Sequence, residues 1–353
     1  MKLSLYGVGS VGRELIRQTI GNQTYVSIAD SSGVIVKPQG FSRTELAEIV
    51  CLKRDGGRIT DYESSGVRHQ KTMIETFFST RPDALVDTST TQSYQLLASA
   101  LNRGINVIGS NKAPYADVSY SDYKSLFMLA RKKKKTIDNR TTVSANLGVL
   151  ERVHEFSKTA GGVDFVRSSP SGTMAYISHR INGEKGLPFS KALRRAKEKL
   201  YTESDPRIDI SGRDSVRKLV TIGRTADVPI EISDIRVEEI LTGDMKCLPV
   251  SRFMEKVKDL DADFRRRVRN AKEKDLALRY VAEMDFNKKR YEVGFKEISK
   301  SDKIAMSSGT DSVVSIYPRS WNGKAMTLEG PGAGIDVTTQ GLIAGLYDIE
   351  NRL

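Results

Sequence analysis

Short apolar runs and amphipathic stretches alternate through the first part of the chain. Four short runs have the length and apolar character of buried strands: residues 3–6, 25–29, 84–87 and 105–108. Residues 11–20 and 96–101 repeat apolar positions at helical spacing, and Gly104 follows the second stretch as a helix stop signal. Strands that alternate with helices predict an α/β domain with a parallel sheet wrapped by helices.

The pattern changes beyond about residue 150, where basic helices and late strands appear. Residues 190–200 and 252–274 are helical in their spacing, whereas 278–284 and 291–298 predict a hairpin because a polar stretch separates them. The final stretch, 335–349, is again apolar at helical spacing. Helices combined with antiparallel strands predict an α+β second region.

Composition is that of a globular protein with two domains. The 353 residues are 39% hydrophobic, and the N-terminus leads straight into a strand instead of a signal peptide. No run of about 18 apolar residues is present to span a membrane, so we expect a cytoplasmic protein. Cys51 and Cys247 lie far apart and form no CxxC pattern, which predicts two reduced, buried thiols and neither a zinc site nor a disulfide.

The formal net charge of +12 allows nucleic-acid binding, attraction of anionic substrates, or simply a basic surface. The densest basic run, 131–135, follows a stretch that is apolar at helical spacing, and cations stabilise the C-terminus of a helix. No aromatic residues interleave with this run, as base stacking would require. We therefore expect a solvated helix end and no nucleic-acid partner.

The sequence Gly7-Val8-Gly9-Ser10-Val11-Gly12 lies between the first predicted strand and the first predicted helix. In a dinucleotide-binding turn, Gly7 would permit the tight turn, Gly9 the approach of a pyrophosphate, and Gly12 close packing of helix on strand. The start of the helix, which includes Val11, would offer free N–H groups to the phosphates. The motif alone is weak, but its neighbours are the strand and helix that it requires.

A carboxylate is expected about 20 residues beyond this turn, and Asp30 stands there at the end of the second strand. Its oxygens can accept hydrogen bonds from ribose hydroxyls, which favours NAD. The alternative is an ordinary turn aspartate. Lys53 and Arg54 could accommodate a 2′-phosphate if they fold toward it, so NADP remains open as the cofactor.

The stretch from Tyr201 to Lys218 is rich in acidic, basic and hydroxyl side chains that could take part in catalysis. Asp214 and Lys218 are four residues apart at what looks like the start of a helix and would share one face, and Asp209 could cap or flank that start. A lysine held by carboxylates can be positioned for proton transfer, and a carboxylate suits the ammonium of an amino-acid substrate. Judged by the spacing of Asp214 and Lys218 alone, an ordinary ion pair on a helix surface is a simpler explanation than a catalytic role.

This stretch is closely similar to the signature of homoserine dehydrogenases, and other segments resemble the same family in the same order. They are the glycine loop and residues 110–114, 171–176, 278–282, 309–311 and 330–334. The resemblance covers nearly the whole chain. It implies reversible interconversion of L-homoserine and L-aspartate 4-semialdehyde with NAD or NADP, a step toward threonine and methionine.

Carried over position by position, the resemblance implies a role for each matching residue. In catalysis, Lys218 matches the proton-donating lysine, Lys112 a second active-site lysine, and Asp214 an acid that holds the substrate and orients the proton-donating lysine. The residues that match substrate-binding positions are Glu203, Asp209, Tyr201 and Thr173. Those that match cofactor-binding positions are Gly7, Gly9, Val11, Gly12, Asp30, Ser89, Thr90, Lys112 and Gly334.

The resemblance also implies the architecture. We expect a Rossmann-like dinucleotide-binding domain over residues 1–150 and an α+β substrate-binding and dimerisation domain over 151–328. The remaining segment, 329–353, would carry a C-terminal helix that returns to the first domain. No kinase-like region precedes the glycine loop and no regulatory tail follows it, so a monofunctional enzyme is expected. The family pairs its subunits through the sheet of the second domain, which implies a homodimer.

Several positions depart from the family pattern. Arg140 stands where a glutamate is usual near a monovalent-cation loop, and Asn146 replaces a glycine. A guanidinium would repel a cation or take its place, although backbone carbonyls of the loop could still bind one, so the metal remains unknown. Ser171 and Ala175 replace asparagines, which leaves an altered substrate preference open.

Two other functions therefore remain open. One is a related dehydrogenase of another short amino-acid aldehyde or alcohol. The other is a cofactor-sensing binding protein aided by its basic surface. Turnover of aspartate semialdehyde would favour the first assignment over both, and salt-sensitive binding to duplex DNA without turnover would favour the binding protein.

Overall fold

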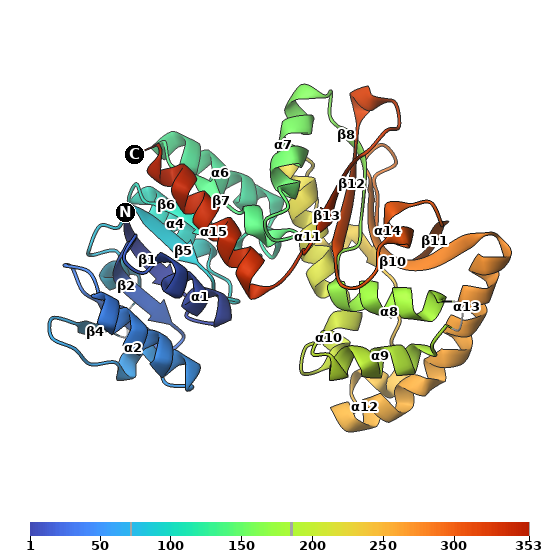
Figure 1. Cartoon of the computed structure of the whole chain (residues 1–353). Helices are drawn as coiled ribbons and strands as arrows, with labels where there is room; N and C mark the ends of the chain where they lie inside the picture. Colours follow the sequence, from blue (N-terminus) through green and yellow to red (C-terminus); the bar gives the residue numbers. More distant parts are fainter. Residues whose placement is uncertain (71–72, 184–185, 353) are drawn as a thin grey trace. The chain divides into compact units, whose positions relative to one another are not determined.

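The computed structural model describes residues 1–70, 73–183 and 186–352. It divides into two compact units (Figure 1): Met1–Asn146 with Gly334–Leu353 form the first, and Leu147–Ala333 form the second. The first unit thus contains both ends of the chain. Within the described ranges, no helix combines the length and apolar character needed to cross a membrane.

A seven-stranded sheet with the strand order β4-β3-β2-β1-β5-β6-β7 forms the centre of the first unit. The strands are β1 (Lys2–Tyr6), β2 (Thr24–Asp30), β3 (Gly33–Val36), β4 (Arg68–Gln70), β5 (Ala84–Asp87), β6 (Asn106–Gly109) and β7 (Ile137–Asp138). The neighbouring strands β2-β1-β5-β6-β7 are all parallel to one another, which confirms the prediction from the alternating pattern. The short strands β3 and β4 pair antiparallel beside β2 and were not predicted.

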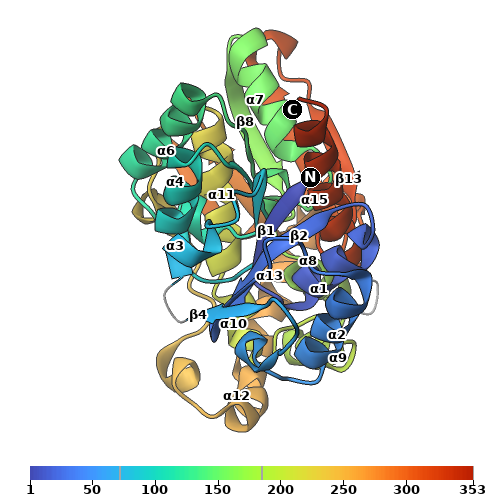
Figure 2. The ribbon, with the colours of Figure 1, turned by 90° about the vertical axis from the view of Figure 1, so that its left-hand side faces the viewer.

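Helices cover both faces of this sheet, as Figure 2 shows. On one face, α1 (Ser10–Thr19), α2 (Arg43–Arg54) and α15 (Ile335–Glu350) bury Leu15, Ile49 and Leu346 in one apolar core. The other face is covered by α3 (Met73–Phe77), α4 (Tyr94–Asn102) and α6 (Tyr120–Lys133), which share a second core. Because α15 packs along α1, the expected return of the C-terminal helix is confirmed.

The predicted helix ends are present as well. Gly104 follows the end of α4 with a φ of +73°, a conformation that glycine adopts without strain. The basic run closes α6, where Lys134 takes the left-handed conformation with a φ of +53°, and residues 131–134 are exposed. The run is therefore a solvated helix end, as expected.

The second unit is built on a six-stranded sheet with the order β13-β12-β8-β10-β11-β9. Its strands are β8 (Val163–Ser168), β9 (Ile235–Val237), β10 (Leu276–Asp285), β11 (Arg290–Ser299), β12 (Ser312–Pro318) and β13 (Met326–Gly330). The predicted hairpin is confirmed, because β10 and β11 pair antiparallel over their whole length.

Helices and aromatic side chains complete this unit. The helices are α7 (Val149–Thr159), α8 (Gly172–Asn182), α9 (Phe189–Glu198), α10 (Pro206–Ile210), α11 (Arg213–Thr225), α12 (Val250–Lys256), α13 (Asp261–Glu273) and α14 (Lys303–Met306). Phe189 of α9 stacks on Phe264 of α13 with ring centroids 4.2 Å apart, and Phe295 of β11 meets Phe264 edge-on at 4.8 Å. This trio joins two helices to the sheet by apolar burial.

Two sequence-based expectations are wrong. The single helix expected over 252–274 is interrupted, because a 3-10 turn (Val257–Leu260) separates α12 from α13. Tertiary hydrogen bonds meet at this break, where the Asp261 carboxylate accepts from the backbone N–H and the hydroxyl of Ser190 on α9. The two cysteines, expected to be buried, are both exposed thiols. Cys51 lies on the outer side of α2, whose inward residues are Leu46 and Ile49.

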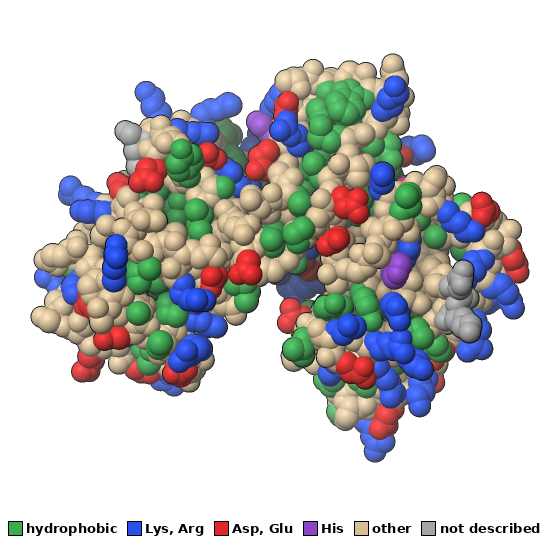
Figure 3. Space-filling view, in the orientation of Figure 1, with side chains coloured by type: hydrophobic (Ala, Val, Ile, Leu, Met, Phe, Trp, Pro, Cys, Tyr) green, Lys and Arg blue, Asp and Glu red, His purple; other side chains and the backbone are tan. Residues whose placement is uncertain are grey.

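The positive charge is spread over the surface of both units. Figure 3 shows lysine and arginine side chains gathered over the region of α9, which carries Lys191, Arg194, Arg195 and Lys197. On the same helix, Phe189 and Leu193 are fully buried. The basic residues there form the solvated side of an amphipathic helix.

Candidate active site

The glycine loop has the close contacts that a dinucleotide-binding turn requires. Gly7 has a φ of +97°, and a Cβ atom added there would lie 2.5 Å from the backbone nitrogen of Ser89. A Cβ at Gly12 would lie 2.1 Å from the carbonyl oxygen of Gly7, so α1 packs directly on the turn. A side chain larger than hydrogen at either position would require the backbone to move.

Gly9 differs from its two neighbours in the motif. It precedes α1 with a φ of −75°, and a Cβ added there would meet no atom within 4 Å. No side chain caps the first turn of α1, and half-buried Val11 belongs to that turn. Uncapped N–H groups with open space before Gly9 form a cradle into which a pyrophosphate fits.

Asp30 ends β2, and its carboxylate is already paired. Its oxygens accept hydrogen bonds from the Ser32 backbone N–H at 2.8 Å and hydroxyl at 2.6 Å, and from the Lys53 ammonium at 2.5 Å. Burial raises the pKa of Asp30, but the hydrogen bonds from Lys53 and Ser32 outweigh burial and leave that pKa below its usual value. Lys53 has thus folded toward the carboxylate, whereas Arg54 pairs with Asp55 at 3.0 Å.

Three of the other predicted cofactor-side residues, Ser89, Thr90 and Lys112, follow the carboxyl ends of β5 and β6. Ser89 is half-buried and donates its N–H to the Asp87 carboxylate at 2.9 Å, while Thr90 is exposed. Lys112 is half-buried and directly precedes α5 (Ala113–Ala116). Gly334 directly precedes α15 with a φ of +129°. Asp87, the buried residue that ends β5, was not among the predicted site residues, although its place at the end of a predicted strand could have drawn attention to it.

The predicted acid and lysine cluster forms in the second unit. The Lys218 ammonium lies 3.0 Å from the Asp214 carboxylate, as their spacing on α11 predicted, and it donates a hydrogen bond to the Pro170 carbonyl at 2.7 Å. The Lys218 side chain is 14% exposed and that of Asp214 is 56% exposed. The lysine is therefore held on two sides within a partly desolvated site.

Asp209 belongs to a second group of contacts. Its two carboxylate oxygens accept from the Thr173 hydroxyl at 2.9 Å and from the Glu203 backbone N–H at 3.0 Å, and the Thr173 hydroxyl also lies 2.5 Å from the Tyr201 carbonyl. Burial, and then the charge of Glu203, raise the pKa of Asp209. Of the two places expected for Asp209, the structure shows the second: Gly212 is the N-cap of α11, and Asp209 flanks the start of that helix.

The remaining substrate-side residues surround these contacts. Tyr201 is 40% exposed and meets Tyr176 edge-on, with ring centroids 5.2 Å apart. The Glu203 side chain is exposed. Ser171 accepts a hydrogen bond from the Met174 backbone N–H at 3.3 Å and so caps α8, the helix that carries Thr173. α10, with Asp209, packs against both α8 and α11, which brings the acid and lysine residues into one region of this unit.

Arg140 is engaged within the first unit. Its guanidinium binds the Asp138 carboxylate of β7 through Nε at 2.9 Å and pairs with Asp348 of α15 at 2.5 Å. Ser144 and Ala145, in the loop that follows, have φ values of +54° and +49°. Over the described parts of the chain, no cluster of three or more acidic, histidine or cysteine side chains is arranged to hold a metal ion.

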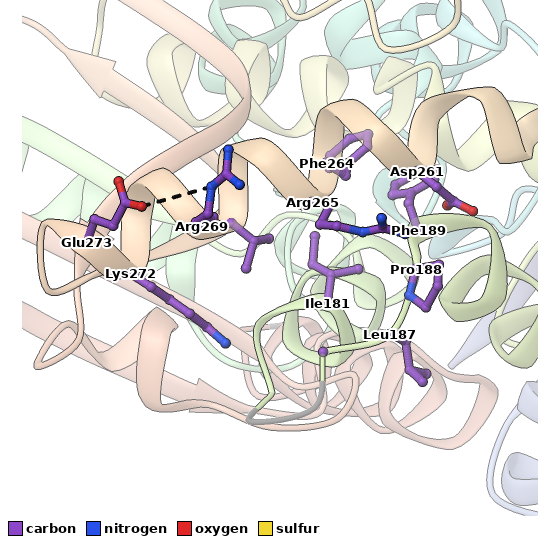
Figure 4. A pocket seen from close by; sticks show the side chains of 12 residues that line it. Ile181, Leu187, Pro188, Phe189, Asp261, Phe264, Arg265, Arg269, Lys272 and Glu273 are labelled. Atoms are coloured by element: carbon purple, nitrogen blue, oxygen red, sulfur yellow. Dashed lines mark ion pairs between the residues drawn. The ribbon is translucent and has the colours of Figure 1, made fainter.

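A cavity of about 520 Å³ opens elsewhere in the second unit (Figure 4). The apolar side chains of Ile181, Phe189 and Phe264 line it, and Arg265 and Lys272 stand at its rim. None of the predicted site residues contributes to its lining. The cavity is thus separate from the Lys218 cluster.

A profile of the family described as homoserine dehydrogenase matches residues 149–347, more than half of the chain. A profile described as glutamate/leucine/phenylalanine/valine dehydrogenase matches residues 1–106. The chain is 26% identical to the homoserine dehydrogenase of Emericella nidulans, over 99% of this chain and 98% of that protein. It is also 26% identical to a chloroplastic bifunctional aspartokinase/homoserine dehydrogenase of Zea mays, of which it covers 39%.

Solved structures show the same fold. A Candida auris protein of unknown function has a TM-score of 0.86 at 22% identity, with 100% of this chain and 98% of that chain covered. A hyperthermophilic archaeal homoserine dehydrogenase in complex with NADPH has a TM-score of 0.72 at 21% identity, with 100% and 98% covered. These likenesses establish that the mixed α/β architecture is a known one.

Proposed function

Since this chain belongs to the homoserine dehydrogenase family, we propose that its own residues carry the reversible, NAD(P)-dependent interconversion of L-homoserine and L-aspartate 4-semialdehyde. The observation that carries the proposal is the placement of Lys218, which is largely buried and held by Asp214 at 3.0 Å and by the Pro170 carbonyl at 2.7 Å. An ordinary surface ion pair would leave the rest of the ammonium in water, whereas the Lys218 ammonium has the Pro170 carbonyl as a second acceptor.

Lys218 is the proton donor and acceptor in this proposal. As the aldehyde is reduced, negative charge develops on its oxygen, and an ammonium donor stabilises that charge and supplies the proton. In the reverse direction the same nitrogen takes the hydroxyl proton. Asp214 holds the lysine side chain in one orientation, and its greater exposure leaves it in contact with water for proton exchange. Lys112 belongs to the first unit and carries the second positive charge that the family resemblance implies.

The acids of the cluster hold the amino-acid part of the substrate. Glu203 offers an exposed carboxylate to the substrate ammonium. Asp209 is occupied by the Thr173 hydroxyl and the Glu203 backbone N–H, so it fixes the segment from which Glu203 projects. Tyr201, packed on Tyr176, forms one wall of the site.

The first unit supplies the cofactor site. We assign the pyrophosphate to Gly7, Gly9, Val11 and Gly12, the adenosine ribose to Asp30, and the nicotinamide half to Ser89, Thr90 and Gly334. The nicotinamide, when bound, supplies or accepts the hydride. The archaeal neighbour was solved with NADPH, which supports a place for Lys53 beside the 2′-phosphate of NADP. When NAD is bound, Asp30 accepts hydrogen bonds from the ribose hydroxyls.

The domain roles and assembly belong to the same proposal. Residues 1–150 bind the cofactor, 151–328 bind the substrate and form a homodimer, and 329–353 complete the cofactor domain. We place the enzyme in the cytoplasm. Sedimentation of the purified protein tests the dimer, since a monomer at micromolar concentration would contradict it.

The decisive experiment measures NAD(P)H oxidation with aspartate semialdehyde. Lys218→Ala should lower kcat by about 100-fold or more, because positioned acid–base groups contribute that much, while the affinity for NADPH stays unchanged. Lys256→Ala is the matched control, since it removes another lysine–aspartate pair of the same unit, with Asp244 at 2.9 Å. Absence of turnover by pure wild-type protein with either cofactor would overturn the proposal.

A further inference from the structure

A buried carboxylate at the cofactor end of the first sheet has no role in the proposal above. Asp87 is the last residue of β5 and is 1% exposed, and Asn111, two residues beyond β6, is 5% exposed. Because β5 and β6 are adjacent and parallel, their carboxyl ends meet at one edge. The two side chains face each other there, between the segment with Ser89 and Thr90 and the segment with Lys112.

Asp87 accepts three hydrogen bonds from these segments. One carboxylate oxygen accepts from the Ser89 backbone N–H at 2.9 Å. The other accepts from the Ser93 hydroxyl at 2.5 Å and from the Asn111 side-chain amide at 3.0 Å. Three donors from two loops therefore converge on one carboxylate.

Asn111 extends the same connection. Its amide nitrogen also lies 2.7 Å from the Thr91 carbonyl and 3.1 Å from the Ser89 hydroxyl, and its amide oxygen accepts from the Ala113 backbone N–H at 3.1 Å. Ala113 is the residue after Lys112 and begins α5. The asparagine thus bonds both to the turn that follows β5 and to the backbone beside Lys112.

We propose that Asp87, acting through Asn111, is a positioning residue that holds the Ser89–Thr90 turn and the Lys112 segment in one fixed arrangement. This inference rests on the proposed function, in which the first segment faces the nicotinamide half and the second supplies a positive charge. Reaction rates depend steeply on such alignment, since small displacements of positioned groups cost large factors in rate.

The chemistry requires a carboxylate at this position. Burial of a carboxylate is costly unless hydrogen bonds compensate for it, and burial raises the pKa of Asp87 although hydrogen bonds from Ser93, Ser89 and Asn111 oppose the change. A carboxylate presents acceptors only, which matches three donors. An amide of the same size would turn an N–H₂ group toward one or more of those donors.

Asp87→Asn is the first test, because it keeps the size of the side chain and changes its charge and its acceptor pattern. We expect kcat/KM for aspartate semialdehyde to fall by about 10-fold to 100-fold, as for a lost hydrogen bond to a charged group, and the dissociation constant for NADPH to rise. Asp83→Asn is the matched control: Asp83 lies just before the opposite end of the same strand and accepts the Lys2 backbone N–H at 2.7 Å. It should leave both quantities unchanged.

A double-mutant cycle with Asn111→Ser separates positioning from general stability. If Asp87 acts through Asn111, the two substitutions share one effect, and Asp87→Asn should cost less than about threefold in the Asn111→Ser background. Fully additive losses in kcat/KM, or wild-type kinetics in Asn111→Ser, would overturn the inference. Asn111→Ser alone keeps the test intact if Asp87→Asn does not fold, since it removes the connection and retains the carboxylate.

The two proposals can fail independently. NADPH affinity, measured by fluorescence titration, requires no substrate. Wild-type protein without turnover would overturn the proposed function, and weaker NADPH binding by Asp87→Asn would still support the arrangement of the Ser89–Thr90 turn. Unchanged NADPH affinity together with unchanged kcat/KM would remove Asp87 from the site while leaving the proposed function in place.

Discussion

The pair formed by Lys53 and Asp30 predicts how this protein separates its two possible cofactors. The lysine ammonium lies 2.5 Å from the carboxylate and also donates to the Gly57 carbonyl at 2.7 Å. Lys53→Ala removes the only cation that the described residues pair with Asp30. A 2′-phosphate placed there would then meet the unpaired carboxylate, whereas ribose hydroxyls could still donate to it.

The size of the effect follows from the geometry. Two unit charges about 4 Å apart interact by about 4 kcal/mol at an effective dielectric constant of about 20. The Lys53 side chain is 17% exposed and stays shared with Asp30, so its net contribution to phosphate binding is that of a hydrogen bond between charged groups, about 1.5–3 kcal/mol. At about 1.4 kcal/mol per factor of ten, the dissociation constant for NADPH should rise roughly 10-fold to 100-fold.

Fluorescence titration of Lys53→Ala with NADPH and with NADH checks this expectation. The constant for NADH should change by less than about threefold, because a neutral ribose gains little from the ammonium. Arg54→Ala is the control, since this neighbour has the same charge but pairs with Asp55 at 3.0 Å. An equal loss for both cofactors would refute the reasoning, as would a larger effect of Arg54→Ala on NADPH than that of Lys53→Ala.

Two further predictions concern the first unit. Hydrogen bonds from Lys37, Ser64 and Ser42 outweigh burial and lower the pKa of Glu45 from 4.5 to about 2, so its contribution to stability is present above pH 4.5 and is lost as the pH falls toward 2. Urea denaturation across this pH range should show that loss in wild type and a smaller one in Glu45→Gln; equal slopes would contradict it. Gly12→Ala should lower the melting temperature, because the new Cβ would lie 2.1 Å from the Gly7 carbonyl oxygen, whereas Gly9→Ala should weaken NADPH binding with the melting temperature unchanged. Equal melting temperatures for the two variants would contradict this distinction.

Much of the fold could be predicted from local patterns. The strand at 84–87, the helix at 335–349 and the hairpin of 278–298 are all present. The strand is buried at every position, as a short apolar run predicts, whereas the helix buries residues at helical spacing. The short antiparallel strands β3 and β4 were missed for two different reasons. β3 is a four-residue strand that pairs with β2 across the tight turn at residues 31–32, a local signal that sequence reasoning took for a turn alone. β4 pairs with β3 from a more distant segment, which local patterns do not show.

In the candidate site, too, contacts within one helix could be predicted from the sequence and contacts between distant segments could not. Spacing alone placed Asp214 and Lys218 on one helix face, because residues four apart are neighbours on any helix. It could not show that the Pro170 carbonyl, 48 residues away, holds the same ammonium, or that Lys53 closes on Asp30 from 23 residues away. The Asp87–Asn111 pair likewise depends on the adjacency of β5 and β6.

By itself, the sequence determined most of the elements, the glycine turn and the kinds of chemical group that the site contains. These depend on residue type and on spacing within a few turns of the chain. The tertiary structure alone decided which groups are paired, which carboxylates are buried, and where the expected helix over 252–274 breaks. The physical reason is that hydrogen bonds and ion pairs act over about 3 Å, and only folding brings side chains from distant segments that close together.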